Sequence, residues 1–306
     1  MKNSKFQVLL YYKYVKIDNP EDVMATQREL CESLNLKGRI IIAPEGINGT
    51  VEGLTTDTKK YMSAVSGSEL FKDIKFKKSA GTGEAFSKLI IRVRPEVVTA
   101  RIPVDPIKIS GKYISADMLH KWFEEQKEFY IVDMRNDYEY QSGYFKNFIP
   151  SGIHNFYDLP NVLSKLEHLK NKTIVTVCTG GIRCEKASGF LLMNGFNDVY
   201  QLEDGIQTYM EKYPNQHFLG KLYVFDKRLT IGFNTDDPKH KVVGKCIGCN
   251  KASDSYVNCE YDICHYHHIR CADCLDEKLG LAFCKKECKE KYLNGPQFLK
   301  SQGATA

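Results

Sequence analysis

The sequence predicts a multidomain protein of mixed α+β and α/β class, with a ferredoxin-like N-terminal domain, a parallel α/β middle domain and a small cysteine-rich C-terminal domain. A chain of 306 residues is long enough for two or three hydrophobic cores. The strand and helix signals change to a strict alternation near residue 107, and eight of the eleven cysteines lie between Cys246 and Cys288. We therefore expect domains at 1–106, 107–220 and 221–306.

The composition is typical of a soluble globular protein, with 42% hydrophobic and 26% charged residues. The apolar run at 6–10 is too short for a signal peptide, and no apolar segment approaches membrane-spanning length. We therefore expect a cytoplasmic protein that makes no membrane contact. In that compartment, eleven cysteines indicate metal binding and thiol chemistry rather than a disulfide framework.

The net charge of +5 is unevenly distributed along the chain, because both terminal domains are basic and the middle domain is slightly acidic. Terminal domains that bind a polyanion on either side of a catalytic domain would show this asymmetry. Ordinary surface scatter is the alternative, since the excess in each domain is small.

The N-terminal domain alternates strand and helix signals in an order typical of a ferredoxin-like sandwich. Asn19 is a candidate cap for its first helix, and EGINGT (45–50) is predicted to be a turn formed by Gly46 and Gly49. The expected elements are strands at 6–15, 39–43, 51–53 and 87–93 and helices at 20–34 and 56–65.

The middle domain has the repeating strand–helix pattern of a mostly parallel sheet, which binds ligands at the carboxyl ends of its strands. Cys178 lies at such an end, directly after the strand TIVTV (173–177). The segment 221–241 is polar and is interpreted as a linker or an extended arm. The expected elements are helices at 117–125, 159–169 and 185–193 and strands at 129–132, 173–177 and 199–202.

The loop CTGGIR (178–183) has the features of a thiolate site. Gly180 and Gly181 allow consecutive N–H groups to turn inward, and Arg183 adds a positive charge at the start of the next helix. Each feature favours an anion on the sulfur of Cys178, either a thiolate or a persulfide. The alternative, a buried cysteine at a strand end, leaves the glycines and the arginine unexplained.

Two other cysteines lie outside the C-terminal cluster. Cys184 either resolves an oxidised or persulfidated Cys178 or is buried in the first turn of the helix. Cys31 is expected to pack in the helix at 20–34.

The C-terminal domain contains an internal repeat of two four-cysteine sets with the paired spacing of zinc ligands. A domain this short builds little apolar core, so bound metal would supply its folding energy. We expect two structural zinc sites, with the order of ligand pairing left open; a single zinc with spare thiols and a metal-free thiol cluster are the alternatives. The predicted ligands are Cys246, Cys249, Cys259, Cys264, Cys271, Cys274, Cys284 and Cys288.

Basic residues alternate with aromatic residues at the end of the N-terminal domain, in FKDIKFKK (71–78) and the strand that follows. Such a pattern is typical of RNA contacts, although a solvated connection between a helix and a strand is the alternative. The candidate RNA-binding residues are Lys72, Lys75, Lys77, Lys78, Arg92 and Arg94.

Two motifs together resemble a known family. The segment YIVDMRNDYEYQSGYF (130–145), followed by CTGGIR, resembles the rhodanese domain. The longer form CTGGIRCEKAS, between a domain carrying EGINGT and a cysteine-rich domain, resembles the rhodanese-related tRNA uridine hydroxylases, the tRNA hydroxylation protein O family. The resemblance covers nearly the whole chain.

The resemblance implies a reaction and a set of site residues. The reaction is the oxygen-dependent conversion of the wobble uridine at position 34, in the anticodon loop of tRNA, to 5-hydroxyuridine. Cys178 corresponds to the active-site cysteine of the family, a candidate persulfide carrier. The other corresponding residues are Asp133 and Arg135 of the rhodanese motif and Gly180, Gly181 and Arg183 of the loop.

The chain departs from general rhodaneses at two places. The segment GYFKNFIPSGI (143–153) replaces the usual Gly-His-Ile-Pro run and argues against a simple thiosulfate substrate. Asp204-Gly205 replaces the usual double glycine near the domain end and is expected only to alter a turn.

No flavin or nicotinamide fingerprint and no facial-triad spacing is recognisable, so molecular oxygen would react with an activated base. We hypothesise that Cys178 adds to C6 of the uracil and that Arg183 or the loop amides stabilise the resulting oxyanion. Two other functions compete: a thiosulfate or persulfide sulfurtransferase, and a non-catalytic RNA-binding zinc protein.

Overall fold

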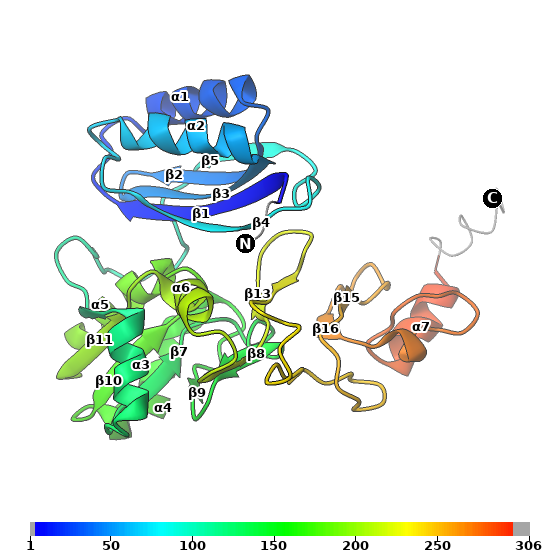
Figure 1. Ribbon diagram of the computed structural model, residues 1–306. Helices are drawn as coiled ribbons and strands as arrows, with labels where there is room; N and C mark the ends of the chain where they lie inside the picture. Colours follow the sequence, from blue (N-terminus) through cyan, green and yellow to red (C-terminus); the bar gives the residue numbers. More distant parts are fainter. Residues whose placement is uncertain (1–3, 296–306) are drawn as a thin grey trace.

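The computed structural model describes residues 4–295 (Figure 1). Its N-terminal domain is a five-stranded sheet in the order β4-β1-β3-β2-β5. The first four strands pair antiparallel, and β5 is added parallel to β2. This is the expected ferredoxin-like fold with one additional edge strand. The elements are β1 (Phe6–Tyr14), α1 (Pro20–Ser33), β2 (Lys37–Ala43), β3 (Gly46–Leu54), α2 (Thr55–Ser66), β4 (Lys75–Ala80) and β5 (Leu89–Val93).

The two helices of this domain cover one face of its sheet, and the opposite face lies against the middle domain (Figure 1). Helix α1 begins where expected, because the side chain of Asn19 accepts a hydrogen bond from the Asp22 N–H.

The segment EGINGT differs from its prediction as a turn. The turn is formed by Pro44 and Glu45, and β3 already begins at Gly46. Gly49 lies inside β3, where a Cβ atom would come within 2.2 Å of the Tyr11 ring. The glycine is therefore required for close packing within a strand. In the sequence, such a glycine resembles a turn residue.

The middle domain is a parallel sheet in the order β6-β11-β10-β7-β9, as the alternating pattern predicts. Helices α3 and α6 lie on one side of it and α5 on the other (Figure 1). Its elements are β6 (Lys112–Ile114), α3 (Ala116–Glu124), β7 (Tyr130–Asp133), β9 (Ile149–Pro150), β10 (Thr173–Val177), α5 (Ile182–Met193), β11 (Asp198–Leu202) and α6 (Gly205–Lys212).

Two parts of this domain depart from the expected elements. The predicted helix at 159–169 is broken into a 3₁₀ segment (Phe156–Val162), the single turn α4 (Leu163–Leu166) and a second 3₁₀ turn. Pro160, inside the first segment, has no N–H to continue an α-helical ladder. Helix α6 was not expected, and it begins at Gly205, where the sequence indicated only an altered turn.

The segment 221–241 is more ordered than a linker. A short hairpin of β13 (Leu222–Tyr223) and β14 (Thr230–Ile231) extends toward the N-terminal domain (Figure 1). At its tip, the Lys227 N–H donates to the Ala85 carbonyl over 3.0 Å, and Arg228 Nη1 donates to Ser79 Oγ over 2.8 Å. The hairpin therefore joins the C-terminal part of the chain to the first domain.

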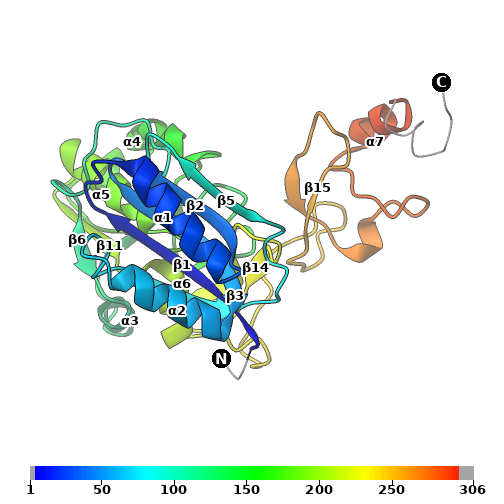
Figure 2. The same ribbon diagram turned by 90° about the horizontal axis from the view of Figure 1, so that it is seen from above.

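The cysteine-rich domain lies beside the other two domains (Figure 2). It contains little regular structure, as its cysteine spacing indicates. Its elements are β15 (Tyr256–Asn258), β16 (His267–Ile269), a 3₁₀ turn at Ala272–Cys274 and α7 (Lys286–Leu293). The two remaining short strands, β8 (Gly143–Phe145) and β12 (Phe218–Gly220), belong to the middle domain and pair with each other. Within residues 4–295, no helix is both long and apolar enough to cross a membrane.

Lys186 connects the first two domains through a buried network. It lies on α5, only 1% exposed, and its ammonium group binds Glu45 over 2.8 Å and Glu96 over 2.7 Å. Tyr12 and Tyr14 of β1 add hydrogen bonds from their hydroxyls to Glu185 and to the Ile182 carbonyl. These contacts hold the lower face of the N-terminal sheet over the start of α5.

Candidate active site

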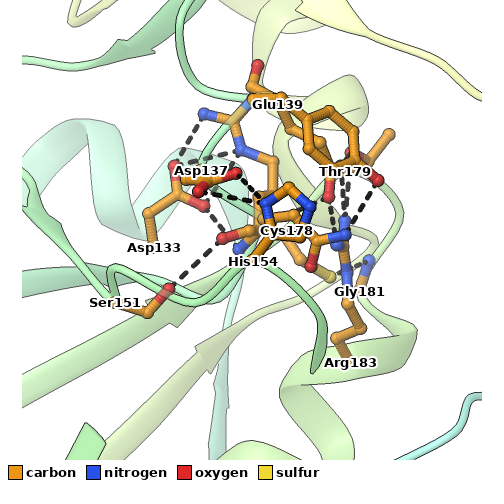
Figure 3. Close-up of polar contacts among 12 residues, drawn as sticks. Asp133, Asp137, Glu139, Ser151, His154, Cys178, Thr179, Gly181 and Arg183 are labelled. Carbon is orange, nitrogen blue, oxygen red and sulfur yellow. Dashed lines mark hydrogen bonds and ion pairs between the residues drawn. The ribbon is translucent and has the colours of Figure 1, made fainter. Parts of the chain in front are cut away.

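Cys178 lies at the carboxyl end of β10, in the centre of the parallel sheet (Figure 3). It is completely buried, and α5 begins four residues later. The Gly181 N–H points back and donates to Cys178 Sγ over 3.2 Å. The loop thus surrounds the sulfur with hydrogen-bond donors, as an anion-binding nest does.

The pKa of Cys178 is lowered to about 6, so the sulfur is a thiolate at neutral pH. Burial acts to raise this pKa. The pKa is lowered by the neighbouring Cys184 thiol, by the charge of Arg183 and by the backbone N–H groups of both residues, which together outweigh burial.

Cys184 remains a protonated thiol beside the Cys178 thiolate. Burial raises the pKa of Cys184 well above its usual range, and the hydrogen bond to Cys178 raises it further. Cys184 lies in the first turn of α5 and is completely buried. Its thiol additionally stabilises the neighbouring thiolate.

The loop is held tightly against α6 by Gly205. A Cβ atom on this residue would lie 2.6 Å from both the Gly180 carbonyl carbon and the Gly181 nitrogen, and its φ is +73°. The closeness allows the first amides of α6 to reach the loop: Ile206 N–H donates to the Cys178 carbonyl over 2.9 Å. The Asp204-Gly205 replacement therefore keeps the one glycine that the loop requires.

Glu139 fixes the position of Arg183. Both side chains are buried, and the two guanidinium nitrogens Nη1 and Nη2 bind the two carboxylate oxygens of Glu139 (Figure 3). A bidentate pair of this kind has a defined geometry. Glu139 therefore holds one N–H of each of these two nitrogens and fixes the guanidinium group beside the loop.

Asp133 and Arg135 lie beneath the same segment. Arg135 is fully buried, with Nε and Nη2 donating to Asp133 and Nη2 also donating to the Gly143 carbonyl over 2.8 Å. These contacts shape the segment 135–143, which carries Glu139. Their geometry is that of positioning residues for the loop.

A cavity of about 320 Å³ opens above Cys178, between the two domains. The lower face of the N-terminal sheet supplies Tyr12, Arg39 and Asn48, and the hairpin supplies Phe225. From the middle domain, Asn136 joins Cys178 in the wall. A pocket of this size with aromatic walls and few polar groups suits a small planar ligand such as a nucleobase.

A surface groove of about 460 Å³ shares Arg39, Phe86 and Phe225 with the cavity. Lys88 and Lys227 also line this groove, and both are exposed. The sequence carries no signal for these basic residues, because they lie far apart along the chain and converge only in the fold.

The six candidate RNA-binding residues lie elsewhere, and none of them lines the cavity or the groove. Lys77 is buried between the domains beside Asp204, where burial lowers its pKa, and Lys75 binds Glu203 and Asp204. Phe71 is buried in the core of the first domain. The remaining four are exposed on the surface, with Lys72 paired to Glu69: Lys72, Lys78, Arg92 and Arg94.

The eight cysteines of the C-terminal domain converge into two groups that interleave the repeat. The first two cysteines of each half form one group, and the last two of each half form the other. The groups are Cys246, Cys249, Cys271 and Cys274, and Cys259, Cys264, Cys284 and Cys288.

Both groups fit a tetrahedral zinc ion. A Zn–S bond of about 2.3 Å gives a sulfur–sulfur edge of about 3.8 Å. The sulfur atoms of Cys249 and Cys271 are 3.6 Å apart, and in the other group Cys284 lies 3.6 Å from both Cys264 and Cys288. Four thiolates complete the coordination, so either ion would be structural and not open to substrate.

One further group could hold a metal ion: His120, Glu124 and His217. The Glu124 side chain is 62% exposed and forms an ion pair with His217 over 2.8 Å. The sequence did not indicate this group, because His217 is far from α3 along the chain.

Family models match three parts of the chain: the UPF0176 acylphosphatase-like domain at residues 6–97, the rhodanese-like domain at 115–212 and the rhodanese C-terminal domain at 219–289. A tRNA uridine(34) hydroxylase of Cytophaga hutchinsonii is 41% identical over 285 residues, covering 93% of this chain and 90% of the relative. One of Bacillus cytotoxicus is 40% identical over 310 residues, covering 98% and 94%. A solved rhodanese-related protein from Thermoplasma volcanium covers 33% of this chain and 93% of its own, with 25% identity and a TM-score of 0.28.

The lowered pKa of Cys178 predicts the pH dependence of its alkylation. The thiolate is present above the pKa, so the rate of iodoacetamide labelling should be half-maximal near pH 6 and fall as the pH drops further. Replacing Arg183 with Met removes a neighbouring charge and should move this midpoint upward. Peptide mass spectrometry of Cys178 measures the labelling.

Arg183→Met leaves Glu139 buried without its partner, so the double variant Arg183→Met/Glu139→Gln serves as the matched comparison. Its midpoint should also lie above that of the wild type. A wild-type midpoint near the ordinary cysteine value of about 8.5 would contradict the proposed thiolate.

The interleaved groups predict how metal is lost from paired variants. Cys249→Ser/Cys271→Ser removes two ligands from one group and should lower the metal content from two ions per chain to one. Cys249→Ser/Cys259→Ser removes one ligand from each group and should weaken both sites. Elemental analysis of the purified protein distinguishes these results. If instead Cys249→Ser/Cys259→Ser loses one ion and Cys249→Ser/Cys271→Ser weakens both sites, each half of the repeat binds its own ion.

Proposed function

The chain belongs to the tRNA uridine(34) hydroxylase family, and on that premise we propose that it hydroxylates the wobble uridine of tRNA at C5, with Cys178 as the reacting group. The observation that supports this role is the thiolate at the base of a cavity large enough for one base. Thiolates add to electron-poor double bonds, and the C5–C6 bond of uracil is one. A base must leave its stack to reach a cavity of this kind, as other base-modifying enzymes require.

The first step would be the addition of Cys178 Sγ to C6. A bond forms between sulfur and C6, and the electron pair of the double bond moves through C5 onto O4 as an enolate. The N–H groups of the loop and of α6 provide local positive potential for such an anion. Carbon C5 of the enolate is then electron-rich enough to react with molecular oxygen.

The overall reaction needs one oxygen molecule, two electrons and two protons. One oxygen atom remains at C5 as the hydroxyl group, and the other leaves as water. We assign the two electrons to an external thiol reductant, which forms a disulfide. Loss of the C5 proton and cleavage of the S–C6 bond then restore the double bond and the free thiolate, so neither flavin nor nicotinamide is required.

The groove beside the cavity is the proposed path of the anticodon loop. Arg39, Lys88 and Lys227 place three positive charges along it, and Phe225 stands where the groove meets the cavity. Phosphates between the wobble base and its neighbours would contact the basic residues, while the aromatic ring offers a stacking surface. We expect this reaction in the cytoplasm.

The proposed ions at the two cysteine groups are Zn²⁺. Zinc held by four thiolates cross-links chain segments and takes no part in the reaction. The segment they stabilise carries His267, which lines the basic groove.

Replacing Cys178 with Ser tests the role of the thiolate. We expect 5-hydroxyuridine at position 34 to disappear from tRNA incubated with Cys178→Ser protein and a thiol reductant, because a serine hydroxyl is not ionised at neutral pH. Cys31→Ala changes a buried cysteine of the N-terminal core and should retain the product. Nucleoside mass spectrometry measures both.

The same assay under ¹⁸O₂ tests the oxygen source, and the label should appear in the C5 hydroxyl. Full hydroxylation by Cys178→Ser would refute the role of the thiolate. Labelling from water instead of ¹⁸O₂ would refute the role of molecular oxygen.

Charge removal distinguishes the groove from the outer edge of the N-terminal domain. Arg39→Ala and Lys227→Ala should each weaken binding of an anticodon stem-loop RNA and reduce the salt dependence of its affinity by about one counterion. Lys72→Ala, just before β4 at the opposite edge of the sheet from β5, should change neither. If Lys72→Ala weakens binding and the first two variants do not, the RNA follows the segment 71–78 that the sequence pattern indicated.

A further inference from the structure

Asn136 carries a buried hydrogen-bond acceptor without a partner. Its side chain is 9% exposed, and within the described residues its Oδ1 atom receives no hydrogen bond. Leaving such an atom unpaired is costly, and most buried polar atoms in folded proteins are paired. A ligand that supplies a donor would remove this cost.

Both backbone polar groups of Asn136 and one N–H of its side-chain amide are occupied, and these contacts fix the direction of the free oxygen. The backbone N–H donates to Glu139 Oε1 over 2.9 Å, and Nδ2 donates to the Tyr138 hydroxyl over 2.8 Å. The residue follows Arg135, whose buried pair with Asp133 holds the backbone in place. The amide is therefore anchored on both sides of its acceptor.

Asn136 lines the same cavity as Cys178, together with Thr179 and Gly180 of the loop. The residue that carries the unpaired acceptor thus forms part of the wall of the space that we assign to the base. Most of the remaining wall is apolar or aromatic, including Phe86, Phe156 and Phe225. An acceptor in such surroundings discriminates strongly between ligands with and without a matching donor.

We propose that Asn136 Oδ1 accepts a hydrogen bond from N3–H of the uracil ring and thereby selects uridine at this site. This inference rests on the proposed function of the cavity. Uracil carries its ring donor at N3, on the side of the ring away from the C5–C6 bond, so Asn136 can hold one edge while Cys178 meets the other. Cytosine presents an acceptor at N3, which would face the acceptor of Asn136.

Binding of a modified RNA tests the proposal without requiring turnover. The probe is an anticodon stem-loop with uridine or 3-methyluridine at position 34, bound to full-length Cys178→Ser protein and measured by fluorescence anisotropy. The methyl group removes the N3–H donor, and the affinity should fall about tenfold. Equal affinity for the two RNAs would overturn the proposal.

A substrate–variant cycle separates this contact from simple crowding by the methyl group. With Asn136→Ala in the Cys178→Ser background, uridine RNA should bind about tenfold more weakly, and methylation should cause little further loss. Asn48→Ala, which alters another asparagine of the cavity, should retain the full effect of methylation. Additive losses in the Asn136→Ala protein would overturn the proposal.

Failure of the role proposed for Asn136 can be distinguished from failure of the proposed function. If the wild-type protein does not hydroxylate uridine 34 but the binding cycle shows the expected coupling, the recognition by Asn136 stands and the reaction must be reassigned. If hydroxylation occurs but the two RNAs bind equally, only the role of Asn136 is refuted. Thermal unfolding of each variant confirms that the loss of binding does not reflect loss of the fold.

Discussion

The buried ammonium group of Lys186 holds together the two domains that form the cavity. It forms ion pairs with the carboxylate of Glu45, in the turn before β3, and with the carboxylate of Glu96, after β5. A charge buried to this extent is tolerated only when it is paired, so the N-terminal sheet must dock for α5 to be stable as it stands. The cavity roof is therefore a consequence of how α5, the helix after the Cys178 loop, is packed.

Both sides of this junction line the cavity that we propose to hold the base. The middle domain supplies the thiolate and the amides that stabilise it, while Tyr12, Arg39 and Asn48 from the first domain enclose the space above. A parallel α/β domain alone would leave Cys178 at an open edge of its sheet. The first domain covers that edge and forms the opposite wall of the cavity above Cys178.

The sequence predicted what is encoded locally and missed what depends on distant pairing. The parallel sheet and the nucleophile loop follow from short periodic segments and from one run of residues, CTGGIR. Glu139, Asn136 and Lys186 had no comparable signal, because a single carboxylate, amide or amine acquires a role only from partners that the fold brings near. The basic pattern at 71–78 predicts RNA contacts, yet in β4 successive residues point to opposite faces, so that Lys77 is buried and Lys78 is exposed.

The interleaved cysteine groups have a consequence for how the chain is made. The cysteines from 246 to 264 leave the ribosome first, and they include two ligands of each group but the complete set of neither. Until Cys274 follows, any ion captured by these four thiols is held by a combination absent from the finished protein. If both groups bind zinc as proposed, correct assembly of this domain requires ligand exchange or delayed metal loading, and the supply of zinc during translation becomes a determinant of how much folded protein a cell obtains.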